Sequence, residues 1–547
     1  MKLFHDLIKY SVLAAVASGA TFSFVAGVRA DEGTTRSFPG RDSGSPSLNP
    51  RSSVGRRVIA PKIPYSARSA AAMYSRMRSF SKPGLAFLEA TNNKRRDVVS
   101  QKACTDLEST GFAPSDSTGA QGLKGSLSAS NVSLAWVDGT ATTASCRTPL
   151  ITSLKSFFNV SEFDEVLFDP QVQYVDSAKK FIVLAESLFQ DSNDQNLYIG
   201  VIDDVSRSSA PSGKVYKIPL SEGRDKFCKK KASDFYDYPK MGIGANAIAV
   251  TSNNFGRSVY GTVLAFNLED AISEKNTLRS TCFGVKDGLS ILFNTNPSQV
   301  LNYSVGSGGN TSTMLLDSPG SGGGNTLKLY RLKWNPAGTG SHSLDELPAI
   351  NLPAAWVSPQ NASQPNTSDT VDVLDGRFVS AGTQIGAANS ETVFNAHSVQ
   401  CVDDSSFSCV RGYKIQPSRA QFLGPEVRVS GASSFNASLA YNGQDRIYLT
   451  SSFSSSDLKP GTSLTEFLFK NGKISDVLAV ILNQGNGTCK DGGDRCRWGD
   501  YSQTTLVPST SGTNPRIGSK KVVSYDQNYT GSRQSDWKML KTTAFFN

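Results

Sequence analysis

The chain has 547 residues, of which 38% are hydrophobic and 19% are charged, and it contains 47 glycines. A chain of this length can bury a large core, and the glycine content suits a loop-rich all-β protein better than a helical one. Most of the net charge of +9 lies in residues 31–100, which hold 13 Lys or Arg against 5 Asp or Glu. The rest of the chain is close to neutral, which argues against a nucleic-acid partner, because such proteins carry a basic patch on the fold itself.

Residues 1–30 predict a secretory signal peptide. A positively charged start precedes an uncharged, largely apolar stretch over 11–28, and Val28-Arg29-Ala30 supplies small residues at a cleavage site. The alternative is a membrane anchor that stays attached, but the stretch is short for a bilayer span. We therefore expect a secreted or extracellular protein that begins at or after Asp31 and has no transmembrane segment after signal removal.

Residues 31–103 predict a disordered basic leader or pro-segment. The segment is rich in Arg, Ser, Gly and Pro and shows little hydrophobic periodicity. Lys94-Arg95-Arg96 would suit a processing protease, and it would equally suit a solvated linker. The sequence leaves both interpretations open.

From residue 104 to residue 547 the pattern is one of short β-prone runs separated by turn residues. Clear runs are 133–137, 180–185, 197–202, 262–266, 327–334, 446–450 and 521–525. Turns that open such runs recur every 58–73 residues, at Asp169-Pro170, Asp237-Tyr238, Asn302-Tyr303, Asp375-Gly376, Ser433-Ser434 and Asp500-Tyr501. This spacing predicts an all-β protein, a β-propeller of six or seven blades over residues 104–547, in which 537–545 forms a closing strand.

Several motifs occur in a fixed order along the chain. They are Phe168-Asp169-Pro170, Asp237-Tyr238-Pro239, Thr251-Ser-Asn253-Asn-Phe255 and Arg497-Trp-Gly-Asp-Tyr-Ser502, with weaker members at Asp375-Gly-Arg377 and Asn395-Ala-His397. In this order they resemble the motifs of a family of secreted β-propeller proteins. The resemblance covers about residues 150–547 and implies the fold and an extracellular setting.

Eight cysteines occur, at positions 104, 146, 228, 282, 401, 409, 489 and 496. Because the number is even and the chain carries an export signal, four disulfides are expected. Sequence proximity suggests the pairs Cys104–Cys146, Cys228–Cys282, Cys401–Cys409 and Cys489–Cys496, out of the 105 pairings that eight cysteines allow. A zinc site is disfavoured because the chain has no Cys-x-x-Cys and only three histidines.

Nine sequons offer sites for N-glycosylation if the host glycosylates its secreted proteins. They are Asn131, Asn159, Asn302, Asn310, Asn361, Asn366, Asn436, Asn486 and Asn528.

Candidate catalytic residues are few. Asp237 and Asp500 could face the central channel as paired carboxylates, with Arg497, Tyr501 and His397 beside them. The simpler interpretation is that each Asp caps its turn by accepting from backbone N–H groups and that His397 is structural. We expect no metal site and no cofactor among these residues. The oxygen-rich loops Asp191-Ser-Asn193-Asp194 and Asp491-Gly-Gly-Asp494 could bind calcium, although neither has EF-hand spacing.

Two classes of function follow. The first is a secreted or cell-surface binding or structural propeller without catalysis, whose partner is an extracellular glycan or protein. The second is an extracellular glycan-active hydrolase or lyase with its site on the propeller axis. The two are separated by whether the five candidate side chains converge in one open cleft, because propellers host both classes.

Overall fold

The computed structural model describes twenty segments of the chain: 31–32, 34–42, 87–90, 98–109, 112–141, 146–162, 164–189, 194–222, 225–226, 228, 234–256, 259–283, 295–300, 312–317, 323–335, 342–386, 391–490, 495–509, 515–533 and 535–546. The predicted signal peptide, most of the leader including residues 94–96, and residues 302–303 lie outside them. In the described part of the chain, neither of the two helices has the length to span a bilayer.

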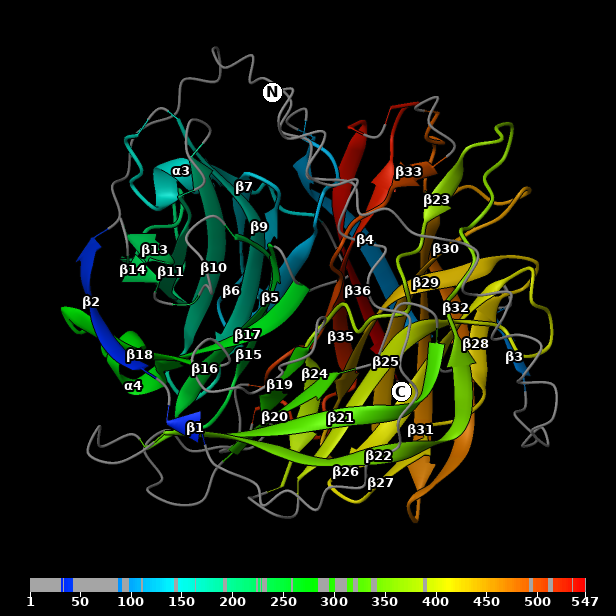
Figure 1. Cartoon of the computed structure of the whole chain (residues 1–547). Coiled ribbons are helices and arrows are strands. Elements are labelled where there is room, and N and C mark those ends of the chain that lie inside the picture. Colours follow the sequence, from blue (N-terminus) through cyan, green and yellow to red (C-terminus); the bar gives the residue numbers. More distant parts are fainter. Residues whose placement is uncertain are drawn as a thin grey trace.

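The described strands form a β-propeller of seven blades, each built on four antiparallel strands (Figure 1). Blade 1 consists of β5 (Thr118–Gln121), β6 (Gly125–Ser130), β7 (Ser133–Asp138) and β8 (Leu150–Ser153), and blade 2 of β9 (Glu165–Val175), β10 (Lys180–Phe189), β11 (Asn196–Asp203) and β12 (Lys214–Pro219). Blade 3 consists of β15 (Phe235–Ile243), β16 (Ala247–Phe255), β17 (Val259–Asn267) and β18 (Thr277–Phe283). Blade 4 consists of β19 (Asn296–Val300), β20 (Ser312–Asp317), β21 (Gly323–Lys333) and β22 (Ser343–Val357).

Blades 5 to 7 complete the ring. Blade 5 consists of β24 (Gly382–Ile385), β25 (Thr392–Gln400), β26 (Ser408–Gln416) and β28 (Glu426–Val429), and β27 (Arg419–Phe422) also pairs with β26. Blade 6 consists of β29 (Ser433–Tyr441), β30 (Arg446–Ser454), β31 (Gly461–Lys470) and β32 (Lys473–Gln484). Blade 7 consists of β34 (Gln503–Leu506), β35 (Lys521–Tyr529), β36 (Trp537–Phe546) and β4 (Val98–Glu108). The innermost strands β5, β9, β15, β19, β24, β29 and β34 lie side by side in this order, and β34 returns to β5. The prediction of an all-β propeller is confirmed.

The ring closes with a strand from the N-terminal part of the chain. β36 is the predicted closing strand, but it is the third strand of blade 7 rather than its outer edge. β4 pairs with it antiparallel from Val98 opposite Phe546 to Glu108 opposite Lys538, and in Figure 1 the blue β4 lies beside the red β36. Joining the two ends of a chain in one blade covers sheet edges that would otherwise stay open. The propeller therefore begins at Val98, inside the segment that was predicted to be a leader.

Other described parts of the leader also form strands on the outside of the blades, in contrast to the predicted disorder. β2 (Thr34–Asp42) pairs with both β12 and β18, and so joins the outer edges of blades 2 and 3. β1 (Asp31–Glu32) pairs with β22, and β3 (Phe87–Ala90) pairs parallel with β28. Backbone pairing needs no hydrophobic periodicity, which explains why the composition of this segment gave no sign of it.

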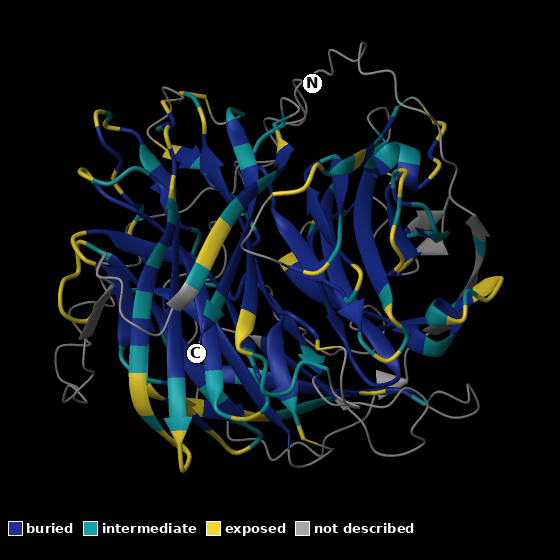
Figure 2. Ribbon diagram, turned by 180° about the vertical axis from the view of Figure 1, so that it is seen from behind, coloured by how far each residue is buried: buried dark blue, intermediate teal, exposed yellow. Residues whose placement is uncertain are grey.

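The remaining elements are short. They are the pairs β13 (Ser221–Glu222) with β14 (Asp225–Lys226) and β23 (Thr370–Asp372) with β33 (Arg495–Arg497), and the helices α3 (Leu154–Phe157) and α4 (Leu268–Ile272). Each helix begins after a capping side chain, Ser153 or Asn267. The hydrophobic core lies between neighbouring blades, and Figure 2 shows the strands buried along most of their length, with exposed residues mainly at the tips of loops.

Four disulfides connect Cys104 with Cys146, Cys228 with Cys282, Cys401 with Cys409, and Cys489 with Cys496. These are the pairs that sequence proximity suggests. The disulfide between Cys104 and Cys146 attaches β4 to the loop after β7, so a covalent bond joins blade 7 to blade 1 where the ring closes.

Candidate functional site

Three innermost strands carry the same bulge near their start. The register shifts across Asp169-Pro170 in β9, Tyr238-Pro239 in β15 and Asn436-Ala437 in β29. The first residue of each pair has a positive φ, of 49°, 61° and 51° respectively. Proline fits such a position because it has no N–H to offer to the ladder. Two of the six repeated turns in the sequence, at Asp169-Pro170 and Asp237-Tyr238, therefore mark this bulge, and the residue equivalent to Asp169 is Tyr238 rather than Asp237.

Carboxyl groups from four blades gather on innermost strands or just before them. Asp116 precedes β5, Asp169 lies on β9, Asp237 lies on β15, and Asp500 precedes β34. The backbone N–H of Asp500 donates to Oδ1 of Asp116 over 2.7 Å. Asn131 holds two of the acids together, because its Nδ2 donates to Asp116 and its Oδ1 accepts from the backbone N–H of Asp169. We call these four acids the axial carboxyl cluster.

Two tyrosines from blades 3 and 7 fill the space beside this cluster. The rings of Tyr238 and Tyr501 stack with their centroids 5.1 Å apart. The hydroxyl of Tyr238 donates to the backbone carbonyl of Asp500, and that of Tyr501 donates to Oδ2 of Asp169, each over 2.8 Å. Both tyrosines are buried. Protein groups therefore occupy this part of the axis, and they satisfy one another.

Two ion pairs lie at the more exposed side of the cluster. Arg377 donates to both carboxylate oxygens of Asp375, over 2.7 and 2.9 Å, and Arg497 donates to Asp500. Arg377 also lies 4.7 Å from the ring centre of Tyr238. The exposed fractions are 26% and 15% for the side chains of Arg497 and Asp500, and 10% and 11% for those of Arg377 and Asp375. We call these four residues the axial mouth.

Burial first, and then the charge of Asp500, raise the pKa of Asp116 to about 7 and that of Asp237 to about 6. The pKa of Asp169 is also raised well above its usual value, by burial first and then by the charge of Asp116. At the mouth, burial favours the neutral form of Asp375, but the charge of Arg377 outweighs it and lowers the pKa. Asp116, Asp169 and Asp237 therefore take up protons at a higher pH than an exposed Asp does, while Asp375 is ionised at neutral pH.

Of the five candidate catalytic residues, four lie in this region: Asp237, Arg497, Asp500 and Tyr501. Asp237 accepts from the backbone N–H of Tyr238 over 2.8 Å, as the turn-capping interpretation expects. Asp500 differs, because its carboxylate holds Arg497 rather than a backbone N–H. The residues converge, but Tyr501 and much of the cluster are enclosed, so the arrangement is not one wide cleft.

His397 lies elsewhere, in the core around blade 5. Its Nδ1–H donates to the carbonyl of Gly376 over 2.5 Å, and its Nε2 lies 3.1 Å from the hydroxyl of Tyr413. The ring packs against Trp356 and Phe378. Burial lowers the pKa of His397 to about 3, so the ring is neutral and structural.

One group of side chains has the composition of a cation site. Carboxylate oxygens of Asp169, Glu186 and Asp237 lie within 4.8 Å of one another, and oxygen ligands are those that calcium and magnesium prefer. A second group, Cys401, Asp403 and Cys409, is excluded because its cysteines form a disulfide. Of the two oxygen-rich loops that could bind calcium, residues 191–193 and 491–494 lie outside the described residues.

The sequence did not identify Asp116, Asn131 or Glu186 as residues of the site, and it did not indicate that Asp169 lies among other carboxyl groups. Asp116 stands in Ser115-Asp116-Ser117, which has no counterpart among the repeated motifs. Asp169 and Asp375-Gly-Arg377 belonged to those motifs and could have been added to the site on that basis. The contacts between blades that define the cluster join residues up to 384 positions apart, which no local pattern reveals.

The structure divides the predicted glycosylation sites. Asn131, Asn436 and Asn528 are buried, and the amides of Asn131 and Asn436 are used in hydrogen bonds. Asn159, Asn366 and Asn486 are exposed, Asn361 is half-buried, and residues 302 and 310 lie outside the described part.

We therefore expect protein secreted from a glycosylating host to carry N-glycans among Asn159, Asn366 and Asn486, and none at Asn131, Asn436 or Asn528. A chain glycosylated at a buried amide could not form these contacts and would be lost before secretion. Glycopeptide mapping of the folded, secreted material measures the occupancy of each site. A glycan at Asn131 in folded protein would contradict the environment described for the cluster.

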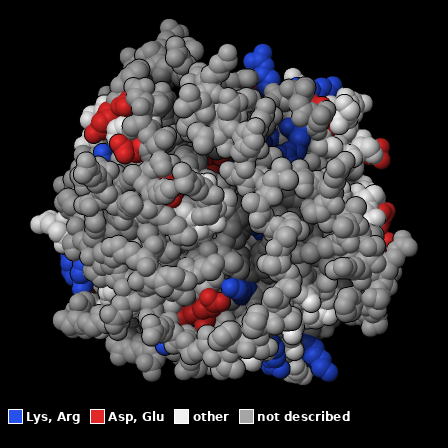
Figure 3. Space-filling view, viewed as in Figure 1, with Lys and Arg blue, Asp and Glu red and all other residues white. Residues whose placement is uncertain are grey.

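Charged side chains are distributed rather than concentrated on the face seen in Figure 3, where the described basic and acidic residues lie singly and in small groups. A continuous basic patch, which is typical of nucleic-acid binding, is not formed by the described residues of this face.

Comparisons with known proteins were made for sequence and for structure. No family model matches the sequence, and no curated protein matches it. Among solved structures, a sialidase of Trypanosoma rangeli in complex with 2,3-difluoro-KDN is similar with 11% identity and a TM-score of 0.34, over 69% of this chain and 56% of the sialidase. A subtype N10 neuraminidase-like protein of A/little yellow-shouldered bat/Guatemala/060/2010 has 8% identity and a TM-score of 0.31, over 68% of this chain and 91% of that protein.

An endo-arabinase from Bacteroides thetaiotaomicron has 10% identity and a TM-score of 0.28, over 56% of this chain and 95% of that protein. These values transfer no activity and no residue role. The resemblance to a family of secreted propellers therefore stays a prediction.

Proposed function

We propose that the chain is a secreted β-propeller that binds an extracellular glycan at its axial mouth without turning it over. The observation that carries the proposal is the contrast between Asp116 and Asp169, which are enclosed, and the partly exposed residues of the axial mouth. Asp116 and Asp169 are buried and hydrogen-bonded to protein groups, so they do not meet a ligand. The side chains of the pairs Asp375–Arg377 and Arg497–Asp500 are 10–26% exposed, and their charged groups could bond the hydroxyl groups of a sugar.

An extracellular setting is supported by the four disulfides, because disulfides form and persist in oxidising compartments. The predicted signal peptide agrees with it. A protein ligand in place of a glycan is the alternative partner, and it is an outcome of the test below.

Binding of the purified protein to an array of extracellular glycans tests the proposal. Replacing Asp375 with Asn removes a charged acceptor at the mouth, and we expect it to weaken binding of the selected glycan about 10- to 100-fold, since hydrogen bonds to charged groups are worth about 1.5–3 kcal/mol. The matched control is Arg495→Gln, which removes the exposed partner of a pair with Asp372 that is not part of the axial mouth. The proposal fails if no glycan binds, or if both variants bind as the parent does.

A glycan-active enzyme is the second candidate, and Asp237 favours it. This side chain is only partly buried, and its pKa of about 6 suits a general acid near neutral pH. The glycans selected on the array would be incubated with the protein and assayed for new reducing ends or unsaturated products. Turnover that disappears in Asp237→Asn, while the melting temperature is retained, would replace the binding proposal by the enzymatic one.

A further inference from the structure

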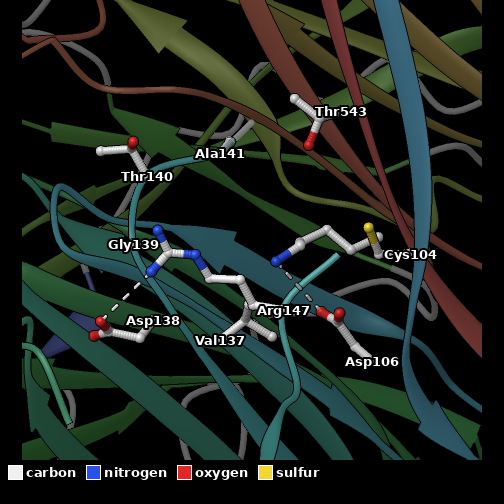
Figure 4. A pocket seen from close by; sticks show the side chains of 10 residues that line it. Cys104, Asp106, Val137, Asp138, Gly139, Thr140, Ala141, Arg147 and Thr543 are labelled. Carbon is white, nitrogen blue, oxygen red and sulfur yellow. Dashed lines mark ion pairs between the residues drawn. The ribbon is translucent and has the colours of Figure 1, made fainter. Parts of the chain in front are cut away.

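A pocket lies where the ring closes, between β7 of blade 1 and the strands β4 and β36 of blade 7 (Figure 4). Lys541 of β36 and Asp106 of β4 both line it. Asp106 is the extra residue of a bulge, because Thr105 pairs with Leu540 and Leu107 pairs with Met539. A bulge redirects a side chain, and here Asp106 is brought to the side of Lys541, with 3.8 Å between its Oδ2 and Nζ.

The two groups form a poor ion pair. Their separation exceeds a hydrogen bond, and both residues are buried, at 2% exposure for Asp106 and 7% for Lys541. Oδ1 of Asp106 accepts no hydrogen bond from any described residue. Burial raises the pKa of Asp106 in spite of the charge of Lys541, and burial lowers the pKa of Lys541. Burial therefore shifts both groups toward their neutral forms, because a buried pair with weak geometry does not repay the loss of hydration.

Two hydroxyl groups on β6 hold this pair in a reactive arrangement. Ser128 donates to Oδ2 of Asp106 over 2.5 Å, and Ser126 accepts from Nζ of Lys541 over 2.8 Å. The serines are two residues apart and so lie on one face of the strand. One hydroxyl polarises the carboxyl group toward attack, and the other accepts a hydrogen bond from the amine and so orients it.

We propose that Lys541 and Asp106 condense into an intramolecular isopeptide bond. The lone pair of Nζ attacks Cγ of the protonated Asp106 carboxyl group and forms a C–N bond. The C–O bond to the hydroxyl then breaks, and the hydroxyl leaves as water with one proton from the amine. The products are a secondary amide and one water, so the step needs no oxidant, reductant or further reactant, and the adjacent pocket gives the water a way out.

Such a bond would fasten the ring at its closure. β4 is held by backbone pairing to β36 and by the disulfide Cys104–Cys146 to blade 1. Cys104 lies directly opposite Lys541 in the register, so the disulfide and the isopeptide bond would fix the same short part of β4 to two blades. A cross-link between strands so distant in sequence restricts the unfolded chain strongly.

Peptide mapping of the folded, reduced and alkylated protein tests the proposal. Trypsin should release residues 103–124 joined to residues 539–547 as one branched peptide, lighter than the two together by one water and uncut after Lys541. The pair Lys275–Asp270, a more solvated ion pair at 2.8 Å, is an internal control and should give linear peptides.

Lys541→Arg and Asp106→Ala should each abolish the branched peptide, whereas Asp138→Ala, in the same pocket, should keep it. The decisive result is that of the parent protein, so misfolding of a variant does not affect it. Recovery of the two linear peptides from the parent, with Lys541 and Asp106 unmodified, overturns the proposal and leaves an ordinary buried ion pair. This outcome is independent of whether the mouth binds a glycan.

Discussion

Between pH 5 and pH 8, the free energy of unfolding of the Asp116→Asn variant is expected to fall by about 3 kcal/mol less than that of the parent protein. The pKa of Asp116 rises on folding from 3.8 to about 7. The native state therefore binds more protons than the unfolded chain between these values. The stability that this group contributes is present in full below about pH 4, and it is lost as the pH rises through 7.

The comparison of variant and parent cancels the contributions of titratable groups outside the axial carboxyl cluster. His397 acts in the opposite direction, because its lowered pKa makes the native state less favourable below pH 6.5, but it does so equally in both proteins. The new Asn side chain at position 116 can still accept from the backbone N–H of Asp500, but it loses the oxygen that accepts from Nδ2 of Asn131. At pH 5 the variant should therefore be about 1 kcal/mol less stable than the parent. Urea unfolding at both pH values measures these differences. The control Asp476→Asn, on the exposed part of β32, should retain the parent's pH dependence. If the unfolding free energy of Asp116→Asn also changes with pH as that of the parent does, Asp116 does not take up a proton on folding.

The fold was predictable from local sequence to the extent that each blade is a local unit. The runs 180–185, 197–202 and 262–266 lie within β10, β11 and β17. Antiparallel strands joined by short loops are encoded by alternating residues and turns, so seven blades leave a readable rhythm. The closure of the ring leaves no such pattern in the sequence, because β4 and β36 are more than 400 residues apart and are brought together only when the ring forms.

The site was predictable only in part for the same reason. Arg497, Asp500 and Asp237 stand in motifs that recur along the chain, and these residues do meet. The partners that set their chemistry come from other blades: Asp116 accepts from Asp500, and Asn131 connects Asp116 with Asp169. The bulge also shifts the equivalence by one residue, so that Tyr238 rather than Asp237 occupies the position of Asp169. A pattern of Asp-Pro and Tyr-Pro indicates a bulge but does not say which side chain reaches the axis.

The second large effect is expected for Arg497→Gln. Arg497 holds Asp500, and its charge opposes the rise in the pKa of Asp116 and of Asp237. Without it, these carboxyl groups face one another with less positive charge, and removing one partner of a largely buried pair leaves an uncompensated charge. Because the side chain of Arg497 is 26% exposed, we expect a loss of about 2–4 kcal/mol at pH 8, somewhat below the 3–5 kcal/mol of fully buried pairs.

The loss should be smaller at pH 5, because carboxyl groups whose pKa values are raised take up protons and no longer need the cation. Arg495→Gln is the matched control: it lies two residues away on the same strand, β33, and its pair with Asp372 at 3.2 Å is more exposed, at 38% for Arg495. Pairs of that kind contribute about 0–1 kcal/mol. Chemical unfolding of both variants at pH 5 and pH 8 gives the four values needed. If Arg495→Gln costs as much as Arg497→Gln, or if the cost of Arg497→Gln does not depend on pH, then Arg497 does not act by balancing the axial carboxyl cluster.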